Sequence, residues 1–202
     1  MLENRNRFTI LSSNTQVVNM AHITVDLTDV KDLVKDLQVC PHLIRQSTAS
    51  ALNRTLSFIG AETKRQVQQE YAVTKSIQKA FTKKRATQSD LTAIAMYTDK
   101  SIPMFVFKHT VAQNRFRSPV TITIKKSNGK QTHNGSNPAL FRGYGKKIMR
   151  RESGEKNIRT AYTLSIPQMV ANDKVYKEIA DKAQAYFYKR LEHEVDWRMK
   201  KL

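Results

Sequence analysis

The sequence is short of cysteine. Cys40 is the single cysteine among 202 residues, which excludes an internal disulfide framework and any zinc site built from several cysteines. A lone cysteine of this kind is more often a small buried side chain than a reactive thiol. The fold must therefore be stabilised by packing and hydrogen bonds.

Long hydrophobic runs are also missing. The longest apolar stretches, such as Ile102 to Phe107, are far shorter than the ~20 residues that span a bilayer. The first residues, Met-Leu-Glu-Asn-Arg-Asn-Arg, do not build the apolar core and small-residue cleavage site of a secretory signal. We expect no membrane partner, and a chain that stays in the cytoplasm where it is made.

Patterns that carry catalysis or bind metal are not found. The five histidines are scattered, and none is paired with another at helical ligand spacing. No serine lies in a nucleophile-elbow pattern and no phosphate-cradling glycine loop precedes a helix. Glu192 and Glu194 are two residues apart and diverge on a helix. We expect no enzyme, no cofactor, no metal and no small-molecule substrate.

Acidic residues are few relative to basic ones. Thirty-five Lys and Arg against seventeen Asp and Glu give a formal charge of +18, enough to attract nucleic acid or acidic protein surfaces. From Lys125 to Arg159 there are ten basic residues and two glutamates. Two interpretations stay open for this stretch, a phosphate-contacting surface and a solvated basic face.

The length and composition predict one ordinary globular domain. Apolar residues are 40% and charged residues 26%, close to the average for soluble proteins. Residues 1–20 mix polar and apolar types without a period and are interpreted as an extended N-terminal arm. Residues 21–202 are then a single domain that ends in a long helix.

Hydrophobic periodicity predicts helices at both ends of this domain. The expected helices are Thr28 or Asp29 to about Leu37, Pro41 to about Tyr71, a short capped one over Thr74 to Arg85, and about Asn172 to Met199. The second and the last are the principal core helices, because each has one long apolar stripe.

Strands are expected between these helices and at His22 to Leu27. Leu91 to Phe107 should form two strands divided by Asp99 to Pro103. Val120 to Ile124 alternates and precedes Asn128-Gly129 at hairpin spacing. An exposed loop over Gln131 to Pro138 and a strand pair near Lys147–Arg151 and Thr160–Ser165 follow. The predicted class is α+β, with a mostly antiparallel sheet packed on the two long helices.

Several segments, in this order, carry a resemblance to a known family. They are Ala49-Ser50-Ala51-Leu52-Asn53-Arg54-Thr55, the basic stretch Ile77 to Thr87, Ile102 to Phe107, Pro138-Ala139-Leu140-Phe141 and a strand ending at Arg150 or Arg151. On these residues the chain resembles the minor tail protein Z family of long-tailed bacteriophages and their prophages, over about residues 45 to 190. It departs from that family just before the last helix, where the family usually has a Pro-Ile pair and this chain has Ile158 to Thr163 and then Ser165-Ile166-Pro167.

The resemblance implies a structural tail-completion protein. Such a protein forms a ring, expected to be a hexamer, at the head-proximal end of the tail and enables head–tail joining. Its implied partners are further copies of itself and other phage tail, neck or connector proteins, with genomic DNA in the lumen as a further candidate. The implied location is the virion tail, with assembly in the host cytoplasm. The rival interpretation is a sequence-independent DNA-binding accessory protein.

Two sets of residues are expected to serve interfaces. The first consists of basic side chains that contact neighbouring proteins or DNA: Lys83, Lys84, Arg85, Lys125, Lys126, Arg142, Lys146, Lys147, Arg150 and Arg151. The second is the hairpin turn Asn128-Gly129. In a ring most of the basic side chains should face proteins or the rim, because many phosphate contacts in a channel would hinder DNA passage. Trp197 either anchors at an interface or packs on its own core.

Overall fold

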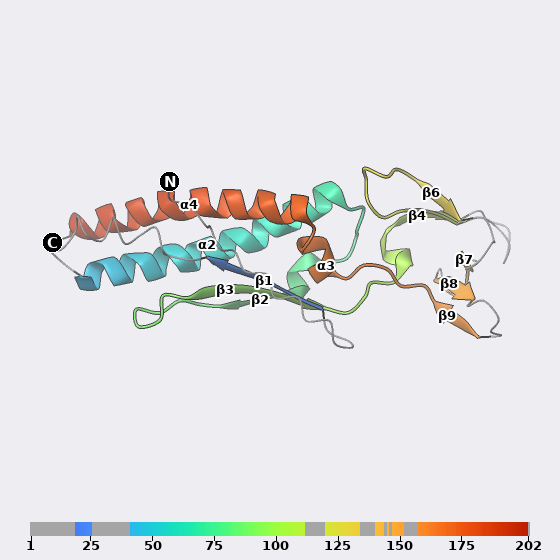
Figure 1. The fold of residues 1–202 in the computed structure, drawn as a ribbon, viewed down its shortest axis with the longest axis horizontal. Coiled ribbons are helices and arrows are strands. Elements are labelled where there is room, and N and C mark those ends of the chain that lie inside the picture. Colours follow the sequence, from blue (N-terminus) through green and yellow to red (C-terminus); the bar gives the residue numbers. More distant parts are fainter. Residues whose placement is uncertain are drawn as a thin grey trace, which may run out of the picture.

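The computed structural model describes residues 19–25, 41–111, 120–133, 140–143, 145, 147–151 and 157–201. The predicted arm lies outside these residues except for its last two, and the predicted helix ending near Leu37 lies wholly outside them. The described chain is elongated, with two long helices and one sheet in one part and short strands at the far end (Figure 1). We call residues 100–165 the β end, and the rest of the described chain the helical half.

Two antiparallel helices form the spine of the helical half. They are α2 (Pro41–Glu70) and α4 (Asp173–Met199), which pack along their length (Figure 1). Both confirm the predicted helices to within one residue. The facing stripes are almost fully buried and include Leu52, Leu56, Ile59, Val175, Ile179, Ala183, Phe187 and Leu191. Burial of these side chains holds the pair together, at ~1.5–3 kcal/mol for each large one.

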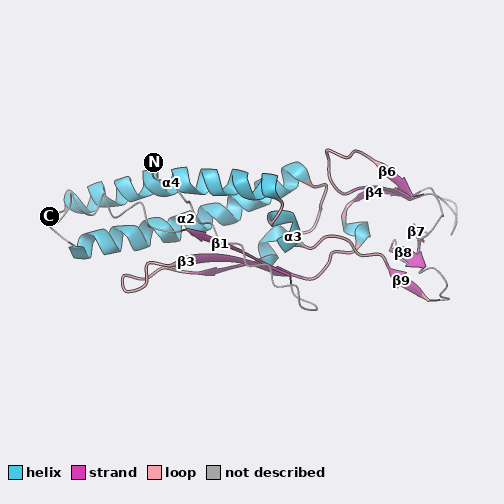
Figure 2. Ribbon diagram, viewed as in Figure 1, coloured by secondary structure: helices cyan, strands magenta, loops and turns pink. Residues whose placement is uncertain are grey.

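A three-stranded antiparallel sheet covers the helices on one side (Figure 2). Its order is β1 (Asn19–Val25), β3 (Ala93–Asp99) and β2 (Phe81–Lys84). Along β3, Ala93, Ala95 and Tyr97 are buried and alternate with more exposed residues. The Tyr97 hydroxyl donates to Thr63 Oγ1 of α2 at 2.7 Å, so the buried face of the sheet is directed at this helix.

The prediction of a helix over Thr74 to Arg85 is wrong. A short 3₁₀ helix, η1 (Ile77–Ala80), is followed at once by strand β2. Phe81 lies opposite Tyr97 in the register, and their rings stack at 5.1 Å. A Cβ on Gly60 of α2 would be 2.7 Å from the Phe81 ring, so only glycine fits there. The four-residue spacing of Ile77 and Phe81 imitated a helix, but Ile77 is a buried residue of η1 and Phe81 is a partly buried residue of β2.

The β end contains two more three-stranded antiparallel sheets. One has the order β4 (Lys108–Val111), β5 (Val120–Thr123), β6 (Gln131–His133), and the other β7 (Leu140–Arg142), β8 (Ile148–Arg151), β9 (Ile158–Thr160). The predicted hairpin is confirmed as β5–β6, and Gly129 takes the left-handed conformation, with φ +65°. This turn favours glycine because other residues rarely adopt positive φ.

Three predicted boundaries in this region are wrong. Gln131–His133 is a strand and not part of a loop, and residues 134–138 lie outside the described chain. The second strand of the last pair is Ile158–Thr160, earlier than Thr160 to Ser165. Ile102 to Phe107 contains η2 (Met104–Val106), capped by Pro103, in place of a strand. The predicted first strand also shifts, since β1 begins three residues before His22.

The segment around Ile102 joins the two parts of the molecule. Ile102 exchanges backbone hydrogen bonds with residues 163 and 164, donating to Leu164 O at 3.2 Å and accepting from Thr163 N at 2.9 Å. Met104 N donates to Ala161 O at 2.8 Å. The outgoing and returning chains thus pair where the helical half meets the β end. The return continues into the short helix α3 (Ile166–Val170), whose Ser165 and Gln168 form a capping box. The mixed helices and antiparallel sheets confirm the α+β class.

Candidate functional site

The structure divides the predicted basic set among three places. Lys83 and Lys84 lie on β2, an edge strand of the sheet in the helical half, and Arg85 follows it. All three side chains are exposed. Lys84 Nζ lies 3.2 Å from Asp90 Oδ2 in an exposed pair. Lysines on an edge strand also discourage unwanted strand pairing, which explains this group without a ligand.

Lys125 and Lys126 support the end of a helix. The last turn of α2 has no basic residue of its own, and the β5–β6 loop supplies one, because Lys126 Nζ donates to Gln68 O at 2.7 Å and Lys126 N to Glu70 O at 2.8 Å. Lys125 is half-buried, with its Nζ 5.7 Å from the centre of the Tyr71 ring. The negative end of the helix dipole stabilises a cation at this position. Asn128 and Gly129 remain exposed at the turn beyond it.

The third group lies on the outermost sheet, β7–β8–β9. Arg142, Lys147, Arg150 and Arg151 are exposed there, whereas Lys146 lies outside the described residues. Arg159 of β9 belongs with them, because the register places it directly opposite Arg150. Sequence reasoning left Arg159 out of the site, and only the strand pairing could have included it. We call Arg142, Lys147, Arg150, Arg151 and Arg159 the tip cluster.

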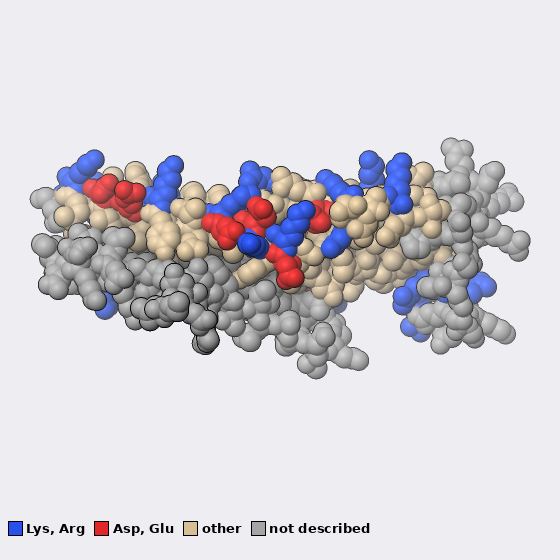
Figure 3. Space-filling model, turned by 45° about the horizontal axis from the view of Figure 1, so that its top comes forward, with Lys and Arg blue, Asp and Glu red and all other residues tan. Residues whose placement is uncertain are grey.

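Charge is distributed unevenly between the two parts of the molecule. Residues 100–165 contain fourteen Lys or Arg and two Glu, a net +12 of the total +18. Both glutamates lie outside the described residues, so the described β end has ten basic residues and no acidic one. Residues 41–99 and 166–202 together contain seventeen basic and ten acidic residues. Figure 3 shows red and blue atoms intermixed over the helices and blue without red toward the β end.

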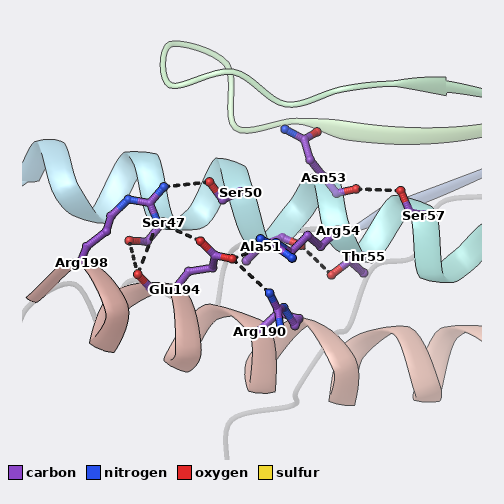
Figure 4. Close-up of polar contacts among 10 residues, drawn as sticks. All are labelled: Ser47, Ser50, Ala51, Asn53, Arg54, Thr55, Ser57, Arg190, Glu194 and Arg198. Atoms are coloured by element: carbon purple, nitrogen blue, oxygen red, sulfur yellow. Dashed lines mark hydrogen bonds and ion pairs between the residues drawn. The ribbon is translucent and has the colours of Figure 1, made fainter. Parts of the chain in front are cut away.

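The most elaborate polar cluster is in the helical half, around Glu194 of α4 (Figure 4). Its side chain is 7% exposed, and three arginines surround it. Arg54 Nε and Arg190 Nη2 lie 2.9 and 3.2 Å from Oε1, and Arg198 Nη1 lies 2.9 Å from Oε2. Arg54 comes from α2, so the cluster bridges the two helices.

Two serines of α2 complete this cluster. Ser50 Oγ accepts from Arg198 at 3.0 Å, and Ser47 Oγ donates to the backbone oxygen of Glu194 at 3.3 Å (Figure 4). Burial raises the pKa of Glu194, but the Arg198 hydrogen bond and the three positive charges outweigh it and lower the pKa below its ordinary value. The carboxylate is therefore charged near neutral pH and joins α2 to α4.

A second buried carboxylate, Glu62, does the same farther along the helices. Its side chain is 5% exposed and accepts from Gln66 at 2.6 Å and Arg65 at 2.8 Å. Lys182 Nζ of α4 lies 3.1 Å away. Burial raises the pKa of Glu62, and the hydrogen bonds from these partners lower it further than burial raises it. Glu62 and Glu194 thus act as two polar links between the same helices.

Two of the segments that carry the family resemblance meet in the helical half. Asn53 of α2 makes a two-way bond with the backbone of Ala86, donating to its oxygen and accepting from its nitrogen, each at 2.9 Å. This bond ties the motif at residues 49–55 to the end of the basic stretch at residues 77–87. In the first motif Ala51, Leu52 and Thr55 are buried, and Arg54 joins Glu194. These motif residues therefore stabilise the packing of the helical half.

Trp197 is 48% exposed, with Lys201 Nζ 3.7 Å from its ring centre, so this ring is not packed in the core. Within the described residues no group of three His, Cys, Asp or Glu side chains could hold a metal ion. In the same part of the chain no helix has the length and hydropathy needed to cross a membrane.

Comparisons with known proteins returned no relative. No family model, no curated protein and no solved structure matches the chain.

Proposed function

We propose that the protein is a structural component of a tailed bacteriophage, a minor tail or tail-completion protein that forms a ring at the head-proximal end of the tail and enables head–tail joining. A hexamer fits the six-fold symmetry of the tails to which the resemblance refers. In this proposal the chain is not an enzyme and binds no cofactor. It acts in the virion and is assembled in the host cytoplasm.

The observation that carries this proposal is the difference between the two ends of one elongated subunit. A closed ring needs two different patches on each subunit, one for each neighbour. The helical half offers a surface of mixed charge, and the β end offers exposed short strands of positive charge. The ordered motifs of the resemblance add support, because two of them meet in one bond between Asn53 and Ala86.

Mass in solution and particle imaging test the proposal. Light scattering on the purified protein should give six times the 23.2 kDa of one chain, and negative-stain images should show closed rings. Gold labelling of a tagged chain in purified virions should mark the head–tail joint. A chain that stays monomeric in solution and is absent from virions would overturn the proposal, and would favour the accessory DNA-binding interpretation if it still retained DNA.

A further inference from the structure

We propose that the β end is a nucleic-acid-binding surface that contacts the phosphate backbone through the tip cluster, without reading the sequence of bases. The inference builds on the proposed function by naming a partner for one end of the subunit. It changes the expectation that most of the basic residues face proteins. We still expect Lys83, Lys84 and Arg85 to face neighbouring proteins, because they lie in the helical half.

The sign and spread of the charge at the β end favour a polyanionic ligand. The described β end has ten basic residues and no acidic one, so its described residues carry charge of one sign. These residues are Lys100, Lys108, Lys125, Lys126, Lys130, Arg142, Lys147, Arg150, Arg151 and Arg159. A ligand whose negative charge repeats along its length can neutralise such a surface, and released counterions then favour binding.

The strand register brings basic residues of the tip cluster together. Arg150 and Arg159 are paired on neighbouring strands, which lie ~4.8 Å apart, so the register concentrates positive charge at this point of the sheet. Arg142 shares their face of the sheet, because it is paired with Ile148, two residues from Arg150. Guanidinium binds phosphate oxygens in a two-bond geometry. Four of the five residues in the cluster are arginine.

The composition of this surface favours nucleic acid over an acidic protein as the partner. Protein interfaces have a core that is depleted in charge and enriched in large apolar and aromatic side chains. The described β end exposes two large hydrophobic residues, Ile158 at 45% and Tyr162 at 53%, and Ile158 lies between Arg159 in the sequence and Arg151 in the strand register. In the described residues of this end no long helix is present to enter a DNA groove, so the contacts fit phosphates and not base edges.

The test compares two variants of equal charge. One is Arg142→Gln/Lys147→Gln/Arg151→Gln in the tip cluster, and the matched control is Lys79→Gln/Lys83→Gln/Arg85→Gln in the helical half. All six residues are exposed, and none of them has an ion pair within the described chain. Fluorescence anisotropy with a labelled random duplex of about 30 base pairs would measure affinity from about 50 to 200 mM salt.

The tip variant should lose roughly a hundredfold in affinity at about 0.1 M salt, and the negative slope of log affinity against log salt should become shallower by about 2.7. The control variant should change little. Equal losses in both variants would overturn the inference, because total charge and not the tip would then explain binding. Binding of poly-glutamate but not of duplex by the wild type would also overturn it and point to an acidic protein partner.

The mass measurement keeps this inference separate from the proposed function. A ring that ignores DNA removes the inference and leaves the proposed function. A monomer that binds DNA through the tip cluster removes the ring and leaves the DNA contact. Circular dichroism of both variants should match the wild type, since single exposed charges contribute ~0–1 kcal/mol to stability.

Discussion

The helical half and the β end use their charged residues in different ways. In the helical half, buried Glu62 and Glu194 each gather cations from both long helices, so charge is used inside the molecule to fix the packing. In the β end, the described residues include ten basic ones and no acidic one. Nine of these ten side chains are exposed, and Lys125 is half-buried against Tyr71. The formal charge of +18 therefore combines charged residues that stabilise the packing inside the molecule with basic residues that are exposed to a partner.

The largest expected effect is on the core of the helical half. Leu52 of α2 is 0% exposed. Leu52→Ala should therefore lower the free energy of unfolding by about 3 kcal/mol, through lost burial and a cavity. Urea denaturation followed by circular dichroism measures this loss. Leu43→Ala is the control, because Leu43 is only half-buried on the same helix and should cost clearly less. Equal costs at the two positions would contradict the packing described for α2.

The next effect concerns the Glu194 cluster. Glu194→Gln should cost about 2 kcal/mol near neutral pH, less than the ~3–5 of a fully buried pair, because Arg54 is 58% exposed and glutamine keeps an acceptor. Arg190 and Arg198, which are less exposed, lose the same partner. Exposed Glu192→Gln is the control, and it should leave the unfolding midpoint nearly unchanged.

The same carboxylate predicts the direction of the pH dependence. The folded-state pKa of Glu194 is lowered from 4.5, so its stabilisation is present above that pH and is lost as the pH falls through the lower, folded value. Glu62 contributes with the same sign. Stability measured from about pH 7 to about pH 3 should therefore fall less steeply in Glu194→Gln than in the wild type. An unchanged slope would show that Arg54, Arg190 and Arg198 do not lower this pKa.

A smaller effect is expected where α2 holds the β2–β3 loop. Asn53→Ala removes two hydrogen bonds of 2.9 Å to Ala86 and leaves its backbone groups partly unpaired, at a cost of about 1–2 kcal/mol. Ser57→Ala is the control, since the exposed Ser57 hydroxyl makes one 3.4 Å bond to the Asn53 oxygen. Hydrogen exchange should show faster opening at Ala86 and Thr87 in the first variant. Exchange unchanged at these two amides would count against the clamp.

What the sequence predicts well differs between the two parts for a physical reason. The long helices α2 and α4 are predicted to within a residue because a single apolar stripe is buried along each of them. Strand β2 was mistaken for helix, because its conformation is imposed by pairing with β3, about fifteen residues away along the chain. Short strands paired over long distances carry little local signal.

The candidate site shows the same limit. The basic residues are visible in the sequence, but their roles are not, because Lys126 stabilises the end of α2 through a contact 58 residues away, and Arg150 meets Arg159 through strand register. The Glu194 cluster was missed for a similar reason. In the sequence, Glu194 was considered together with Glu192 as a catalytic pair. Arg54, the arginine of α2 that pairs with Glu194, is distant in sequence.

The smallest expected effect on stability belongs to the β end, at Lys147. Its side chain is exposed in the turn between β7 and β8, so Lys147→Glu should change the free energy of unfolding by less than about 0.5 kcal/mol. The functional effect should be large in comparison, because a reversed charge in each copy of a ring repels the same partner repeatedly. Complementation of a phage that lacks this protein would measure joined particles and infectious yield.

Lys79→Glu in the helical half is the matched control, because Lys79 is also exposed and lies outside the tip cluster. Normal yield from Lys147→Glu together with an unchanged melting temperature would make this part of the β end a solvated face, and the difference between the two regions would then be one of composition without function.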